Sequence, residues 1–167
     1  MADVLVAYFS RSGTAEGLAK DFATRLEADL DPIGPASAYR GPLGAVKAGW
    51  QALCKARPRP AFSKHPGHYR CVVLVTPVWV GALSPPARGW LARFGQQVPM
   101  LAAVWVSTSG EAYDQVGAEI ERLSDRALVG HATFAEREAR RGERRDKLDT
   151  LARTVRRALA ETDASAA

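Results

Sequence analysis

The alternation of short apolar runs with amphipathic segments is the feature that most constrains how this chain folds. The runs Val4–Phe9, Cys71–Thr76 and Met100–Val106 are rich in β-branched and aromatic residues and lack the polar alternation of a half-exposed strand. They predict buried strands of a parallel sheet, because such strands are covered on both faces. A short, weaker strand is expected at Leu30–Ile33, and the last strand is expected at Ala127–Phe134.

Helices are predicted between these strands from apolar residues spaced three and four positions apart. The expected helices are Ala15–Asp29, Leu43–Ala56, Pro85–Gln97, Ala112–Arg126 and a closing helix over residues 136–160. Strands that alternate with helices predict a three-layer, doubly wound α/β fold with right-handed crossovers. With 167 residues, the chain has the size of one ordinary domain. Within that domain, a helix and a basic loop at about residues 39–69 form an insertion.

Three loops follow predicted strands and share a composition of small residues: Ser10–Ala15, Thr76–Ser84 and Ser107–Gly110. In a doubly wound sheet, ligands bind at the carboxyl ends of the strands, near the point where the strand order reverses. The functional residues are therefore expected in these loops.

The first of these loops carries the features of a phosphate site. Ser10, Ser12 and Thr14 supply hydroxyls, and Gly13 supplies a flexible backbone at the start of a predicted helix. Unpaired N–H groups and the helix dipole favour an anion at such a place. A simpler interpretation is that Ser12 or Thr14 only caps the helix. The sequence contains neither G-x-x-x-x-G-K-S/T nor G-x-G-x-x-G, which argues against a nucleoside triphosphate loop and a dinucleotide fingerprint.

All three loops resemble those of flavodoxins. Residues 4–19, VLVAYFSRSGTAEGLA, resemble the flavodoxin signature of an apolar strand, a hydroxyl-rich phosphate loop and a helix. The segment TPVWVGALSPP, residues 76–86, resembles the flavin-facing loop of bacterial members, and Ser107–Gly110 resembles their third loop. The resemblance spans nearly the whole chain. It implies bound FMN, a five-stranded parallel sheet in the order 2-1-3-4-5, and electron transfer or the reduction of small molecules such as quinones through the flavin.

On this resemblance, the phosphate lies on the first loop and the flavin ring lies between the loops at Trp79 and Ser109. Trp79 can stack on one face of the ring or pack into the core, and Tyr113 can stack on the other face or lie on its helix surface. Pro77 and Gly81 let the backbone approach the polar rim of the ring. The remaining tryptophans are expected in the core: Trp50, Trp90 and Trp105. The implied cofactor-binding residues are Ser10, Arg11, Ser12, Gly13, Thr14, Ala15, Pro77, Val78, Trp79, Val80, Gly81, Thr108, Ser109, Gly110 and Tyr113.

Two positions of the first loop depart from the family pattern. Ala15 stands where a second hydroxyl usually ends the phosphate loop, and Thr14 stands where Asn is frequent. One lost charge-assisted hydrogen bond costs roughly 1.5–3 kcal/mol, or about 10- to 100-fold in affinity. Arg11, in the same loop, is expected to compensate as a direct phosphate partner. The weakened site keeps open an alternative function, a flavin-free binding or regulatory module.

The basic charge of the chain is regional. The formal net charge is +5, yet no acidic residue occurs from Pro32 to Gly110. That stretch carries Arg40, Lys47, Lys55, Arg57, Arg59, Lys64, Arg70, Arg88 and Arg93. A solvated basic face explains these charges without any partner. Beside a flavin, the same charges favour its anionic, fully reduced form. This favours a two-electron reductase, or a carrier that docks on an acidic partner. No catalytic residue is assigned, because hydride transfer at a flavin needs no protein acid or base.

Other function classes lack the residues they need. Response-regulator receivers require acidic residues after the first and third strands, and low-molecular-weight phosphatases require Cys-x5-Arg; neither pattern occurs here. His65 and His68 have no third metal ligand nearby. The basic segments lack the interleaved aromatic residues of single-strand nucleic-acid binders. The apolar runs are far shorter than the roughly 18–20 residues of a membrane span. The only cysteines are Cys54 and Cys71, which suits a reducing compartment, so a soluble cytoplasmic protein is expected.

Overall fold

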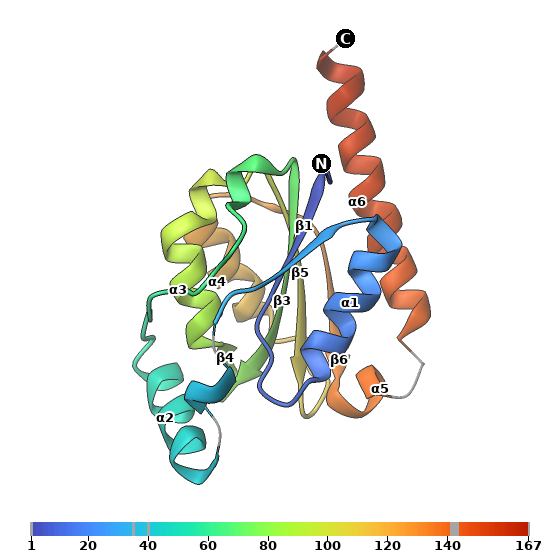
Figure 1. Ribbon diagram of the computed structural model, residues 1–167. Coiled ribbons are helices and arrows are strands. Elements are labelled where there is room, and N and C mark those ends of the chain that lie inside the picture. Colours follow the sequence, from blue (N-terminus) through green and yellow to red (C-terminus); the bar gives the residue numbers. More distant parts are fainter. Residues whose placement is uncertain (1, 35, 40, 141–143, 167) are drawn as a thin grey trace.

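A twisted parallel sheet with helices on both faces forms the molecule (Figure 1). The computed structural model describes residues 2–34, 36–39, 41–140 and 144–166. The strands are β1 Val4–Tyr8, β2 Asp29–Pro32, β3 Cys71–Trp79, β4 Ala82–Leu83, β5 Met100–Ser107 and β6 Leu128–Ala135. The α-helices are α1 Thr14–Leu26, α2 Gly41–Leu53, α3 Pro85–Phe94, α4 Asp114–Ser124, α5 Glu136–Arg140 and α6 Arg145–Ala166. Short 3-10 helices lie at Ala36–Tyr39, Pro66–His68 and Gly95–Gln97.

The parallel strands follow the order β2-β1-β3-β5-β6, and the short β4 pairs antiparallel with β3. When the parallel strands alone are counted along the chain, this is the predicted order 2-1-3-4-5. The order reverses between β1 and β3, so the loops after these two strands lie at the switch point of the sheet.

Residues on each central strand alternate between two apolar layers. β1 contributes Leu5 to the layer under α3 and α4, and Val6 to the layer under α1, α5 and α6. Trp90 and Trp105 are buried in the first layer, as the sequence predicts. The three central strands, β1, β3 and β5, are therefore apolar on both sides, which explains the unbroken apolar runs in the sequence.

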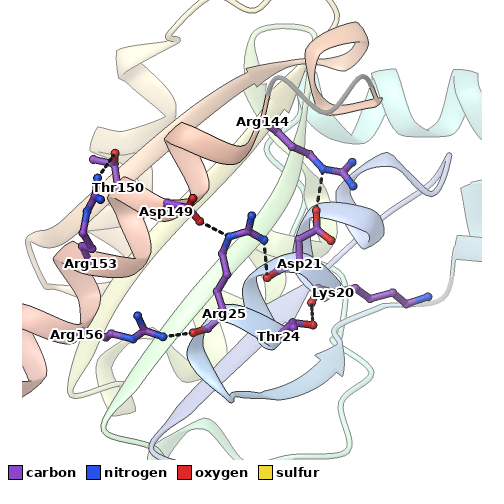
Figure 2. Close-up of polar contacts among 9 residues, drawn as sticks. All are labelled: Lys20, Asp21, Thr24, Arg25, Arg144, Asp149, Thr150, Arg153 and Arg156. Atoms are coloured by element: carbon purple, nitrogen blue, oxygen red, sulfur yellow. Dashed lines mark hydrogen bonds and ion pairs between the residues drawn. The ribbon is translucent and has the colours of Figure 1, made fainter.

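Polar contacts join α1 to α6, and to Arg144 just before α6, at the rim of the second layer (Figure 2). Arg25 pairs with Asp149 at 2.6 Å, and Arg144 pairs with Asp21 at 2.7 Å. Arg156 donates to the backbone carbonyl of Arg25. Exposed ion pairs of this kind contribute only about 0–1 kcal/mol each. The apolar contacts beneath them therefore hold the two helices together.

A β-hairpin replaces the loop predicted at residues 77–84, so that prediction is wrong. β3 continues through Trp79, where Val78 pairs with Leu83 and Trp79 pairs with Ala82. Val80 and Gly81 form the turn with φ angles of 52° and 68°, the left-handed pair typical of a tight hairpin. The strong strand preference of Val78 and Trp79 outweighs the loop signal of the neighbouring proline and glycine.

Three further predictions need correction. The first helix ends at Leu26 rather than at Asp29, because Glu27 adopts a left-handed conformation and Asp29 opens β2. The closing helix is two helices, α5 and α6, with residues 141–143 outside the described part of the chain. Trp50 is 69% exposed on α2 and is not a core residue. Arg40 of the basic stretch also lies outside the described residues. No helix in the described part of the chain is long and apolar enough to cross a membrane.

Candidate functional site

The loops after β1, β3 and β5 meet at the carboxyl edge of the sheet around a cavity of about 90 Å³. The predicted residues that line it are Ser10, Arg11, Ser12, Thr14, Ala15, Pro77, Val78, Trp79 and Thr108. Ser107, which lies in the predicted third loop, lines it as well, and so do Val106 and Glu136, which were not predicted. The other predicted residues do not line the cavity: Gly13, Val80, Gly81, Ser109, Gly110 and Tyr113. The structure thus brings parts of all three loops together.

The start of α1 has no side-chain cap. Gly13 is the N-cap residue, with a φ of 88°, and α1 has no side-chain cap hydrogen bond. Ser10 accepts a hydrogen bond from the backbone N–H of Gly13 at 3.0 Å, which fixes the loop. The interpretation that Ser12 or Thr14 only caps the helix is therefore wrong. Both hydroxyls point to each other, with 3.3 Å between their oxygens.

Glu136 places a carboxylate beside these hydroxyls. It is the first residue of α5, directly after β6, and its Oε1 accepts hydrogen bonds from Ser12 and Thr14, each at 3.4 Å. Sequence reasoning missed Glu136, although the rule that ligands bind at the carboxyl ends of strands applies to β6 too. Glu136 also lines the cavity together with Pro77 and Trp79, which belong to the stretch of the sequence that lacks acidic residues.

Trp79 stands between the core and the cavity. Its ring makes edge-to-face contacts with Phe9, at a centroid distance of 5.6 Å, and with Tyr39, at 5.2 Å. The Arg11 guanidinium lies 6.0 Å from the centre of the Trp79 ring. Burial raises the pKa of the Tyr39 phenol, so this ring stays neutral. Trp79 thus packs against the core, as one of its two predicted roles requires, and it also lines the cavity, while its stacking on a flavin ring stays a prediction.

A buried polar network holds the hairpin that carries Trp79. The Thr76 and Ser84 hydroxyls lie 2.7 Å apart at its base, and both residues are fully buried. Arg88, on α3, donates to the carbonyl of Leu83 at 2.9 Å and to Glu119 of α4 at 2.8 Å. Arg88 is 1% exposed, so it does not belong to a solvated basic face as its place in the basic stretch suggested.

The third loop is closed by its own hydroxyls. Ser107 accepts from the Gly110 N–H at 2.9 Å, and Ser109 lies 3.3 Å from the Tyr113 hydroxyl. Gly110 has a φ of 81°, and a Cβ there would lie 2.9 Å from the Cβ of Ala135. Tyr113 lies against Gly81, where an added Cβ would be 3.6 Å from the Tyr113 ring. The tip of the hairpin is thus in contact with Tyr113, the residue just before α4.

Comparison with known proteins supports the architecture. No protein-family model and no curated protein matches this sequence. Among solved structures, the chain is similar to an FMN-bound flavoprotein from Lactobacillus acidophilus NCFM, with a TM-score of 0.67, 15% identity, and 83% of this chain and 96% of that chain covered. The chain has the flavodoxin-like fold.

Two more structures share this fold. A flavoprotein from Bacteroides eggerthii is 19% identical with a TM-score of 0.63, over 84% of this chain and 94% of that chain. Flavodoxin 2 from Bacillus cereus is 18% identical with a TM-score of 0.58, over 92% of this chain and 97% of that chain. At such identities the likeness concerns the fold, so the chemistry of the site has to be argued from its own residues.

Proposed function

We propose that this chain binds FMN and transfers electrons through it. The observation that carries the proposal is the meeting of three loops around the uncapped start of α1. The hydroxyls of Ser10, Ser12 and Thr14 and the first-turn N–H groups of α1 form a donor set suited to a phosphate. The similar structure from Lactobacillus acidophilus holds FMN, which agrees with this choice of ligand.

The size of the cavity supports a division of roles within the site. At about 90 Å³ it is smaller than the roughly 300–1,000 Å³ of common small-molecule pockets. It suits the phosphate end of FMN, and the ring would lie further out, between Trp79 and the third loop at Thr108–Gly110. Pro77, Val78, Val80, Gly81 and Tyr113 would border that ring. Bound FMN supplies one- or two-electron transfer, and the chain supplies binding, orientation and charge.

The test is a titration of the purified protein with FMN, followed by quenching of flavin fluorescence. We expect Ser12→Ala to weaken binding by about 10- to 100-fold, the effect of one hydrogen bond to a charged group. Ser165→Ala, near the far end of α6, is the matched control and leaves binding unchanged. If Ser12→Ala binds FMN as the unmodified protein does, the phosphate loop is wrongly assigned.

The charge near Trp79 favours a two-electron reductase of small acceptors such as quinones. Arg11 lies beside the Trp79 ring, where its charge would stabilise an anionic, fully reduced flavin. Arg11→Gln should then lower the potential of the fully reduced couple in a redox titration of the FMN-loaded protein. Arg153→Gln, on the exposed side of α6, is the control and leaves it unchanged. An unchanged potential in Arg11→Gln would favour a one-electron carrier instead.

One observation favours the alternative, a flavin-free binding or regulatory module. The carboxylate of Glu136 accepts hydrogen bonds from the Ser12 and Thr14 hydroxyls, and Ala15 has no hydroxyl that could bind a phosphate in their place. The FMN titration separates the two functions, because a flavin-free module shows no saturable quenching of flavin fluorescence.

A further inference from the structure

The outer face of α2 is apolar and exposed. Its large side chains are Leu43, 86% exposed, Val46, 71%, Trp50, 69%, and Leu53, 66%. They are three, four and three positions apart, which places them along one stripe of the helix. Figure 1 shows α2 beyond the end of the sheet, beside β4. A contiguous exposed stripe of this kind is uncommon on a monomer and marks an interaction surface.

The inner face of α2 carries small residues instead. Gly44 is buried, and a Cβ there would lie 2.4 Å from the backbone of Tyr39. Ala48 is also buried, so the helix sits close to the segment below it. Packing within the chain thus uses the small residues and leaves the large ones outside. Packing against the core therefore does not account for the large apolar side chains along the outer face of α2.

The charges around the stripe indicate what covers it. Lys47, Lys55, Arg57 and Arg59 are exposed, and in the described part of the chain none of them pairs with a carboxylate. The sequence has no acidic residue from Pro32 to Gly110. A second copy of this chain would bring like charges together, whereas an acidic protein would complement them.

The helix that carries the stripe packs beside the candidate site. α2 contacts β3 and β4, and Tyr39, just before α2, packs on Trp79 with their ring centres 5.2 Å apart. Trp79 lines the cavity between the loops. A protein bound to α2 would therefore sit beside the group that we propose to carry electrons.

We propose that the outer face of α2, made of Leu43, Val46, Trp50 and Leu53, docks an acidic redox partner that presents an apolar patch ringed by carboxylates. The redox part of this statement rests on the proposed function. From Leu43 to Leu53 the stripe is about 15 Å long at 1.5 Å per residue, which suits a small, transient interface.

The test uses a plant-type [2Fe–2S] ferredoxin, a small acidic redox protein, as the probe. Its affinity for the flavin-free and the FMN-loaded chain is measured by calorimetry at low and high salt. We expect Trp50→Ser to weaken binding by about 30-fold, as for a hot-spot tryptophan. Lys47→Glu should weaken it by about fivefold or more at low salt, and binding of the unmodified chain should fall as salt rises. Arg153→Glu on α6 is the matched charge control and changes binding less than twofold.

Because Trp50 is exposed, Trp50→Ser should keep the thermal unfolding midpoint of the unmodified chain. Lys47 is exposed too, but its ammonium lies 5.4 Å from the centre of the Tyr39 ring, so the midpoint of Lys47→Glu is measured alongside its affinity. The proposal is overturned if the unmodified chain does not bind the probe at low salt, or if both variants bind it within twofold of that chain. It is also overturned if Trp50→Ser abolishes a concentration-dependent dimer, or binding to phosphatidylserine vesicles, while probe binding is unaffected. Docking to the flavin-free chain needs no FMN, so failure of the flavin titration would be separate from failure of this surface.

Discussion

Glu136→Gln is expected to strengthen FMN binding, because the native carboxylate lies where a phosphate would take its hydrogen bonds. Its Oε1 is 3.4 Å from the hydroxyl oxygens of both Ser12 and Thr14. A phosphate on the same hydroxyls would lie within about 5 Å of this carboxylate, given ordinary hydrogen-bond lengths. Two unit charges of the same sign at about 5 Å repel by about 0.8 kcal/mol in water and about 3 kcal/mol at an effective dielectric constant of 20.

The cavity is open to solvent, so the repulsion falls between these limits. Removal of the charge should strengthen binding by about 1–3 kcal/mol, or about 5- to 150-fold. Glutamine keeps the size of the side chain and can still accept from the hydroxyls. The substitution therefore changes the charge with little change in shape.

The assay compares FMN with riboflavin, which has the same ring and no phosphate. Quenching of flavin fluorescence gives both affinities, and only that for FMN should rise in Glu136→Gln. Glu138→Gln is the control, because Glu138 is on the same helix, pairs with Lys147 at 2.7 Å, and does not line the cavity. Weaker FMN binding in Glu136→Gln, or an equal gain for riboflavin, would refute the assignment of the phosphate to this loop.

Three further predictions test the fold that supports the site. Arg88→Met leaves Glu119 without its buried partner and should lower the free energy of unfolding in urea by about 3–5 kcal/mol. Arg122→Met removes an exposed partner of the same carboxylate and should lower it by under about 0.5 kcal/mol. A loss below about 1 kcal/mol for Arg88→Met would contradict the network. Cys54 is exposed and should react with a thiol reagent in the native state, while Cys71, whose pKa burial raises to about 12, should react only after unfolding; two fast thiols would disprove this. Burial and the hydrogen bond to Asp29 raise the pKa of Tyr69 to about 12 from an ordinary 10, so the fold stabilises the neutral phenol and stability should fall as the pH rises from 10 to 12; this fall should be smaller in Tyr69→Phe, and an equal fall would contradict it.

Much of the fold can be predicted from the sequence, because the central strands of the sheet are unbroken apolar runs. Val4–Phe9 and Met100–Val106 are buried on both faces, so nothing polar interrupts them, and their strand assignment is confirmed. The strand order came from the resemblance to flavodoxins and is confirmed too. The hairpin at Val78–Leu83 was missed, because Pro77 and Gly81 carry the local signature of a loop while the pairing partners lie across a turn.

The placement of the three loops at one edge could also be predicted, since it follows from the direction of parallel strands. The side-chain contacts that shape the site could not be predicted from the sequence. Arg88 occurs in a basic stretch, and only the structure shows that Glu119, from another helix, lies beside it. Tyr39 packs on Trp79 from an insertion whose position along the sheet no periodicity defines.

The errors at Trp50 and Glu136 have one physical cause, and it bears on function. A periodic apolar pattern predicts that a helix has an apolar face, but it does not indicate which other element covers that face. Trp50 was therefore expected in the core. A glutamate after the last strand reads as an ordinary helix start, where negative charge is favourable. Both residues obey their local rules and conflict with their surroundings: an indole in solvent, and a carboxylate against the phosphate site that we propose. Such conflicts lower the stability of the fold unless a bound molecule compensates for them, and they are concentrated where proteins bind other molecules. The outer face of α2 and the start of α1 are therefore the two places at which this chain is expected to be completed by a partner.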